Sequence, residues 1–307
     1  MLVAKSLCLD YGDLAAVSDV SFEVSSGEIV GLLGHNGAGK TSIMRMLTGF
    51  LRPSSGSIIV DNTDIWENLE KSQKRVGYLP ESEVLYGDMT VYDYLYYLGK
   101  LNGIQNSQLE SKVKEAILRT GLEDRANWYI EKLSKGFQQR AGVAQAIIND
   151  PKILVLDEPT NGLDPSQVEA MRSMIKTLSN NDTAVILSTH VLQEVEAICD
   201  RAIIIGKGKK LLDAPLASLQ PGNKLIVTTK KSICSSDSSW NEHAMVDRIN
   251  LVDTRTNSFT YSFTAKVGKK AEDIAPFVAN KICELGLGLL ELSPEKRDLQ
   301  NVFREFT

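Results

Sequence analysis

The sequence has few cysteines, no long apolar run and little charge imbalance, and each shortage excludes a class of protein. Its four cysteines are scattered through 307 residues without a C-x-x-C pair, which argues against a disulfide framework and against a zinc site. No apolar run approaches the roughly 20 residues that span a bilayer, and the first residues do not resemble a signal peptide. We therefore expect a chain that stays in the cytoplasm.

The charged residues are nearly balanced. The net charge is −5, and residues 224–307 hold almost equal numbers of basic and acidic side chains. A nucleic-acid binder typically carries a segment with a basic excess, so we expect no nucleic-acid partner. The length of 307 residues predicts a main domain plus a smaller one.

A glycine-rich stretch at Gly34–Thr41 has the spacing GxxxxGK[ST] of a phosphate-binding loop. It follows an apolar run, Glu28–Leu33, that predicts a buried strand, and it precedes a segment of helical periodicity that begins at Ser42. Glycines let the loop turn its backbone N–H groups toward one anion, and the helix adds the positive end of its dipole. We expect Lys40 to reach the β- and γ-phosphates of a nucleotide and the Thr41 hydroxyl to bind Mg²⁺.

A second apolar run, Ile153–Leu156, ends in two acidic residues. It predicts a buried strand that carries Asp157 and Glu158 to the crevice of a parallel sheet. Asp157 can bind Mg²⁺, directly or through water, and Glu158 can accept a proton from an attacking water. His190 follows another predicted strand, Thr183–Ser188, and is in range of the same crevice.

Three further signals are weaker when each is taken alone. Tyr11 precedes the glycine loop, where its ring can stack on a nucleotide base, although a single tyrosine before a turn is more often plain packing. Ser134 and Gly136 open a predicted helix, whose N-terminus would be a second anion site. Asp164 can cap a helix that begins at Pro165.

Residues 84–150 are predicted to form a mainly helical insertion. Thr90 with Asp93, and Ser107 with Glu110, have the spacing of helix-capping pairs. Six of the nine tyrosines lie within residues 78–97. Such a cluster suits a partly exposed docking surface, and it suits the core of an amphipathic helix equally well.

The order of these motifs over residues 2–215 resembles the nucleotide-binding subunit of an ABC transporter. The matching positions are Tyr11 for adenine stacking, Gly34–Thr41 for the Walker A loop, Glu81 for the Q-loop, Leu133–Phe137 for the signature, Asp157 and Glu158 for Walker B, Asn161–Asp164 for the D-loop, and His190 for the switch histidine.

The resemblance implies an α/β fold, with a P-loop ABC ATPase core, an antiparallel β subdomain and a helical insertion. It implies an ATPase that uses Mg²⁺, pairs with a copy of itself or a related chain, and drives a separate integral membrane permease from the cytoplasmic face of the plasma membrane. The implied catalytic residues are Glu158, His190 and Lys40, and the implied metal ligands are Thr41, Asp157 and Glu81. The implied ATP ligands are Tyr11, Gly34, Asn36, Gly37, Ala38, Gly39, Lys40, Thr41 and Ser42 of one subunit, with Ser134 and Gly136 of the other.

Two motifs depart from the common form of the family. Lys135 and Phe137 replace a glycine and a glutamine of the signature, and Glu81 replaces the glutamine of the Q-loop. Both variants resemble the ABC-2 type exporter branch, which includes drug, polysaccharide and sodium efflux systems and the gliding-motility ATPase. We therefore expect this chain to power export.

A second unit is expected after a boundary near residues 220–223, where Pro and Gly interrupt the pattern. Residues 221–307 are predicted to form a small α+β domain, with a half-buried strand around Phe259–Phe263, a helix over Ala271–Leu285 and a last helix over Glu295–Phe306. No residue in this unit indicates catalysis.

Two other functions stay open at this point. The first is a soluble ABC ATPase that acts on ribosomes, RNA or DNA, although such proteins usually carry two ATPase halves or a long coiled coil, and the sequence has one Walker A loop and no sustained heptads. The second is a regulatory subunit that binds ATP with low turnover. Glu158 and His190 argue against it, whereas Lys135 and Phe137 leave it open.

Overall fold

A computed structural model describes residues 1–82, 85–179, 182–219, 224–233, 240, 245–255, 258–266 and 269–294. The chain divides into two compact units, Met1–Leu216 and a second unit that begins at Ala217. Each unit has its own hydrophobic core. The last helix predicted from the sequence, Glu295–Phe306, lies outside the described residues.

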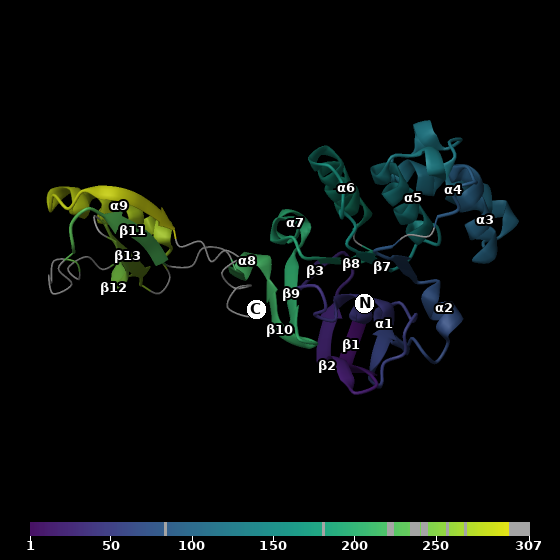
Figure 1. Ribbon diagram of the computed structural model, residues 1–307, viewed down its shortest axis with the longest axis horizontal. Coiled ribbons are helices and arrows are strands. Elements are labelled where there is room, and N and C mark those ends of the chain that lie inside the picture. Colours follow the sequence, from purple (N-terminus) through teal and green to yellow (C-terminus); the bar gives the residue numbers. More distant parts are fainter. Residues whose placement is uncertain are drawn as a thin grey trace. The chain divides into compact units, whose positions relative to one another are not determined.

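A six-stranded sheet forms the centre of the first unit (Figure 1), with the strand order β10-β9-β3-β8-β7-β6. All neighbouring strands are parallel except β9 and β10. Every residue of β3, β7 and β8 is buried, as expected for strands covered on both faces. The bounds are β3 Ile29–Leu33, β6 Val76–Leu79, β7 Ile153–Asp157, β8 Ala184–Thr189, β9 Arg201–Gly206 and β10 Lys209–Pro215.

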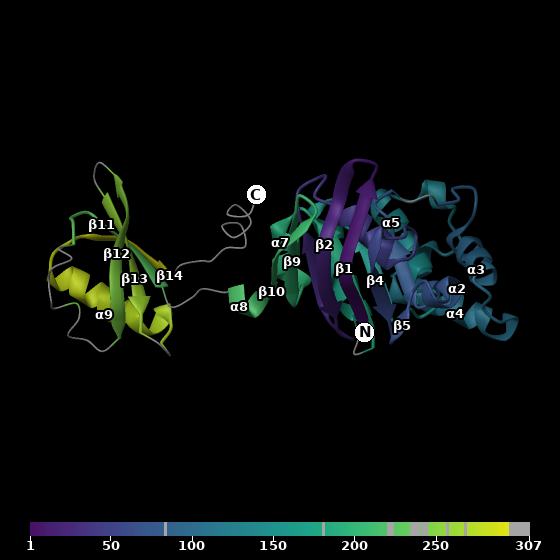
Figure 2. The same cartoon turned by 90° about the horizontal axis from the view of Figure 1, so that it is seen from below.

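A four-stranded antiparallel sheet with the order β2-β1-β4-β5 packs against one face of the central sheet. Figure 2 shows β1, β2 and β4 side by side. Buried residues of this sheet, of the helix α1 and of the central sheet belong to one hydrophobic cluster, which fixes α1 between them. The bounds are β1 Leu2–Tyr11, β2 Leu14–Val24, β4 Ser55–Val60, β5 Thr63–Asp64 and α1 Lys40–Leu47.

Helices lie on the other face of the central sheet and in the predicted insertion (Figure 1). No helix of the described residues is long and apolar enough to cross a membrane. Their bounds are α3 Val91–Leu101, α4 Asn106–Arg119, η1 Glu123–Arg125, η2 Ile130–Lys132, α5 Lys135–Ile147, α6 Pro165–Leu178 and α7 Leu192–Ile198. Two short helices lie elsewhere along the chain: α2 Leu69–Gln73 precedes β6, and α8 Leu216–Leu219 follows β10.

The two capping predictions in the insertion have opposite outcomes. The Thr90 side chain accepts the backbone N–H of Asp93 at the start of α3, which confirms that cap. The Ser107 cap is wrong, because α4 already begins at Asn106 and puts Ser107 inside the first turn. Gly103, with φ +77°, follows the C-cap of α3 at Asn102 and reverses the chain. Gln105 then stands at the N-cap of α4, so this helix begins earlier than the capping pattern predicts.

The second unit is a four-stranded antiparallel sheet, β12-β13-β11-β14, covered by the helix α9 (Figure 2). The rings of Trp240 and Phe263 are in contact in its core, with centroids 5.3 Å apart and planes tilted by 59°. The bounds are β11 Lys224–Thr229, β12 Val246–Arg255, β13 Ser258–Ala265, α9 Ala271–Glu284 and β14 Leu289–Pro294.

Candidate functional site

The glycine loop connects the end of β3 to the start of α1. Gly37 and Gly39 have φ values of +81° and +105°, which L side chains rarely adopt. A Cβ on Gly39 would also lie 2.8 Å from the carbonyl oxygen of Ala16 on β2. No side chain caps the N-terminus of α1, so its first backbone N–H groups face the loop and are available to an anion.

The Lys40 side chain is buried inside this loop. Its Nζ donates hydrogen bonds to the carbonyl oxygens of Gly34, at 2.7 Å, and of His35, at 3.3 Å. The same Nζ lies 3.9 Å from Glu158 Oε1. The loop therefore holds a cation next to the end of β7.

Asp157 ends β7 and is almost completely buried. Its Oδ1 accepts a hydrogen bond from the Ser188 hydroxyl of β8. Its Oδ2 is buried and, in the described part of the chain, has no hydrogen-bond partner. Burial and the nearby Asp157 carboxylate raise the pKa of Tyr78 to about 12, against the opposing effect of the Arg45 guanidinium. A buried carboxylate oxygen without a donor fits a hard cation or its bound water, so Asp157 is suited to Mg²⁺.

Glu158 has a strained backbone with φ +50°. Its N–H donates to the carbonyl and hydroxyl oxygens of Ser188, at 3.2 and 3.0 Å, which holds this conformation. Its two carboxylate oxygens lie 3.1 and 3.0 Å from His190 Nδ1. The carboxylate is buried whereas half of the His190 side chain is exposed, so the pair borders solvent.

Most of the predicted catalytic and phosphate-binding residues line one pocket of about 420 Å³. The lining residues are Ala16, His35, Asn36, Gly37, Gly39, Lys40, Thr41, Ser42, Glu81, Glu158, Asn161 and His190. Two neighbours of this site were missed from the sequence. Ala16 carries no signal, because only the strand register brings it here, whereas Ser188 is a polar residue in an otherwise apolar strand run, which is a weak signal.

The predicted signature residues do not line this pocket. Ser134 stands at the N-cap of α5 without a side-chain capping bond, and a Cβ on Gly136 would lie 2.7 Å from Gln167 Cδ. Lys135 extends toward the D-loop, where its Nζ lies so close to Gly162 that a Cβ on this glycine would collide with it. The Phe137 ring lies 5.4 Å from the Arg125 guanidinium, a cation–π contact that fixes the start of α5.

Tyr11 and Asp164 also lie outside the lining of that pocket. The Tyr11 side chain is 50% exposed and lines a different pocket of about 650 Å³ with residues of α1, β6 and α3. Asp164 caps α6 by accepting the Gln167 N–H at 3.0 Å, as predicted. The Ser166 hydroxyl and the Gln167 N–H together lower the pKa of Asp164.

The comparisons with known proteins all point to one family. The chain matches the family described as "ABC transporter" over residues 17–161. It is 38% identical over 205 residues to "ABC transporter ATP-binding protein NatA" of Bacillus subtilis, an alignment that covers 66% of this chain and 83% of that protein. It is 36% identical over 213 residues to "Nod factor export ATP-binding protein I" of Cupriavidus pinatubonensis, covering 69% of this chain and 66% of that protein.

Solved structures agree with the sequence relatives. An ATP-binding subunit of an ABC transporter has a TM-score of 0.64 at 28% identity, covering 71% of this chain and 91% of that one. The cbiO1 protein of Clostridium perfringens, part of the ABC transporter complex cbiONQ, has a TM-score of 0.65 at 28% identity, covering 71% and 89%. The predicted fold class is confirmed. The chain therefore belongs to the ABC transporter family, as one of its ATP-binding and ATP-hydrolysing proteins.

Proposed function

We propose that this chain hydrolyses ATP in the pocket around Lys40 in order to drive export through a separate membrane permease. ATP-binding subunits of this family dimerise and work with separate membrane permeases. The observation that carries the proposal is the convergence of three groups in one buried region. These are the Lys40 ammonium, the Glu158 carboxylate and the Asp157 oxygen that has no donor among the described residues.

The triphosphate is bound by the glycine loop. Lys40 supplies a charge to the β- and γ-phosphates, and the backbone N–H groups at the start of α1 supply hydrogen bonds. Mg²⁺, when bound, neutralises part of the phosphate charge, and Thr41 and Asp157 are the residues that would hold it, with Glu81 as a third candidate. Tyr11 is proposed to stack on adenine with its exposed ring.

Glu158 is the general base of the reaction. Its carboxylate accepts the proton of a water whose oxygen attacks the γ-phosphorus, while the bond to the bridging oxygen breaks and ADP leaves. His190 contacts Glu158 through Nδ1, and its proposed role is to orient this carboxylate and to contact the γ-phosphate. The short distance between the two side chains supports a shared role.

A second subunit completes the site. Ser134 and Gly136 start a helix whose N-terminus has no side-chain capping bond, yet they lie outside the lining of the Lys40 pocket of their own chain. An uncapped helix N-terminus is suited to a phosphate. We therefore assign these two residues, with Asp164 in the adjoining D-loop, to the nucleotide bound by a partner subunit, which is a copy of this chain or a related one.

The permease is proposed to contact the pocket of about 650 Å³ that α1, β6, α3 and α5 line. Two large apolar side chains in its lining are exposed, Phe50 by 70% and Leu101 by 64%. The lining also includes Tyr78 of β6, the strand that pairs with β7, and β7 ends in Asp157. A partner seated here would therefore lie beside the strands that lead to the nucleotide site. This contact would hold the chain at the cytoplasmic face of the membrane.

The named relatives favour export as the direction of transport. A protein named for Nod factor export is 36% identical to this chain over 213 residues. The signature and Q-loop variants of this chain also resemble the exporter branch. Both observations favour export, and the substrate is set by the permease.

Affinity purification from detergent-solubilised membranes tests the proposal. We expect tagged Glu158→Gln, in the presence of ATP and Mg²⁺, to recover a multi-span membrane protein in stoichiometric amount. Leu101→Asp should abolish this recovery. Leu118→Asp is the matched control, because Leu118 is equally exposed, at 64%, and does not line the pocket. Recovery of ribosomal or nucleoprotein material in place of a membrane protein would contradict the proposal.

A further inference from the structure

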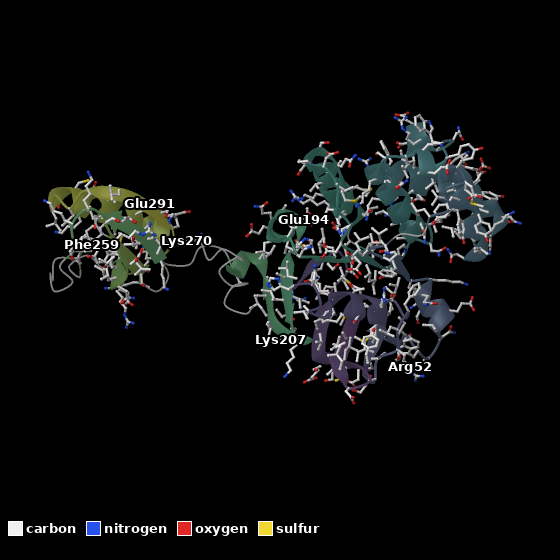
Figure 3. The ribbon with its side chains drawn as sticks, in the orientation of Figure 1. Arg52, Glu194, Lys207, Phe259, Lys270 and Glu291 are labelled. Atoms are coloured by element: carbon white, nitrogen blue, oxygen red, sulfur yellow. The ribbon has the colours of Figure 1, made fainter. Side chains whose placement is uncertain are left out.

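A buried carboxylate lies beside the site without taking part in the roles assigned above. Glu194 lies on α7, where Figure 3 labels it, and only 6% of the residue is exposed. The Thr160 hydroxyl donates to its Oε1 at 2.5 Å, and the Thr189 hydroxyl donates to its Oε2 at 2.9 Å. Each carboxylate oxygen is thus bound to a different segment of the chain.

The two threonines flank the predicted catalytic pair. Thr160 follows Glu158 by two residues and leads into the D-loop, and Thr189 ends β8 directly before His190. Glu194 therefore connects the segment that carries the general base to the segment that carries the switch histidine. Both hydroxyls are buried with the carboxylate, so water does not compete for these hydrogen bonds.

The carboxylate is held at a fixed place. The helix α7 packs so closely on β3 that a Cβ on Gly31 would lie 2.8 Å from Val195 Cγ1 and 3.1 Å from Cys199 Sγ. The Thr189 hydroxyl oxygen also accepts a hydrogen bond from the N–H of Val191 at 3.0 Å. This bond leaves the Thr189 hydroxyl proton directed toward Glu194. The carboxylate can therefore act as a rigid reference point for both threonines.

Burying a carboxylate costs free energy unless hydrogen bonds replace its hydration. An apolar side chain at the same place in α7 would avoid this cost and would give up both contacts. We propose that Glu194 is a positioning residue for ATP hydrolysis, which holds Thr160 and Thr189 so that Glu158 and His190 keep their contact. The inference rests on the proposed roles of Glu158 and His190.

Steady-state ATPase kinetics of the full chain test the inference with shape-matched variants. Thr160→Val and Thr189→Val remove one hydroxyl each, whereas Thr160→Ser and Thr189→Ser keep it. We expect kcat to fall by about 10- to 100-fold in both valine variants and in Glu194→Met, which has no oxygen to accept either hydroxyl, because small misplacements of reacting groups can cost about 100-fold. KM for ATP should stay within about twofold, and both serine variants should keep wild-type kcat.

The contacts should also be coupled. Thr160→Val combined with Glu194→Met should have nearly the kcat of the worse single variant, because the two changes remove the donor and the acceptor of the same hydrogen bond. Multiplicative losses would contradict the inference. Equal kcat in the valine and serine variants would also overturn it, and this comparison decides the matter even if Glu194→Met does not fold.

His190→Ala separates failure of the inference from failure of the proposed function. If His190→Ala lowers kcat while the valine variants do not, only the role of Glu194 is refuted. If His190→Ala also leaves kcat unchanged, the proposed role of His190 is refuted, and the inference falls with it.

Discussion

Replacing Glu158 by glutamine removes one charge from the site and keeps its shape. The backbone bonds of Glu158 to Ser188 persist, so the strained backbone at φ +50° should persist as well. The amide cannot take a proton from water, and loss of a general base lowers kcat by about 10²- to 10⁴-fold. This range corresponds to about 3–5 kcal/mol of barrier.

The affinity of Glu158→Gln for ATP should rise or stay unchanged, although its kcat falls. The Glu158 carboxylate lies 3.9 Å from Lys40 Nζ, in the pocket assigned to the triphosphate. Removing it leaves more of the Lys40 charge for the phosphates and removes a repulsion. We therefore expect Glu158→Gln to bind ATP as tightly as the wild type or more tightly.

Single-turnover hydrolysis of γ-labelled ATP, together with equilibrium binding of a fluorescent ATP analogue, measures both quantities. Glu81→Gln is the matched control, because it removes another carboxylate from the lining of the same pocket and keeps a side-chain oxygen that can bind Mg²⁺. We expect its single-turnover rate to stay within about tenfold of the wild type, as a group that does not take the proton. Unchanged turnover in Glu158→Gln, or equal losses in both variants, would refute the assignment of Glu158 as the base.

Three further predictions concern binding and stability. Lys40→Ala should weaken ATP binding by about 100-fold or more by calorimetry, since it removes the charge beside the phosphates, and wild-type affinity would exclude the phosphate-loop assignment. Tyr11→Ala should weaken it by about 10-fold and Tyr11→Phe should not, because stacking contributes about 1–3 kcal/mol; equal affinities would remove Tyr11 from the site. Burial raises the pKa of Asp213, but Arg201 and Lys210 outweigh it and leave a net lowering. Asp213→Asn should therefore destabilise the fold at pH 7 by about 1–3 kcal/mol, and the difference should begin to shrink near pH 4 and be lost as the pH falls through the lowered pKa of Asp213 in the folded chain; a constant difference down to pH 2 would contradict this.

The local motifs of the site could be predicted from the sequence because their chemistry lies within a few consecutive residues. The spacing of Gly34–Thr41 indicates the loop conformation directly, and the apolar run before Asp157 indicates a buried strand. The structure brings Lys40, Glu158 and His190 to one pocket. The carboxyl ends of parallel strands meet at one edge of a sheet, so this convergence follows once the strands are identified.

The contacts between distant segments could not be predicted in the same way. Ser188 bonds Asp157 and Glu158 only because β8 lies beside β7 in the observed register, and no local pattern reveals that register. Glu194 reads as an ordinary polar residue of a short helix, and its burial depends on how closely α7 packs on Gly31. Tyr11 lies in the lining of another pocket of this chain, so no contact in the structure tests its stacking on adenine, which stays a prediction.

The tyrosine cluster shows why both interpretations stayed open. Tyr94 is buried, whereas Tyr86 and Tyr97 are exposed by 44% and 40%. The rings of Tyr86 and Tyr94 are in edge contact, with centroids 5.8 Å apart. One cluster thus contributes to the core and to the surface. Tyr94 and Tyr97 lie on α3, which turns their side chains to different sides, whereas Tyr86 precedes this helix.

The central claim is that the ATP site around Lys40 is completed by the signature residues of a second subunit. Light scattering coupled to size-exclusion chromatography measures this directly on the Glu158→Gln chain, whose parent mass is 33.8 kDa. The account predicts the monomer mass without nucleotide and about twice that mass with ATP and Mg²⁺. Ser134→Glu in the same background should bind ATP and stay monomeric, because a carboxylate would repel the partner's phosphates. A dimer that Ser134→Glu does not affect would contradict the account, and a chain that is saturated with ATP and remains monomeric would exclude a second copy of this chain as the partner.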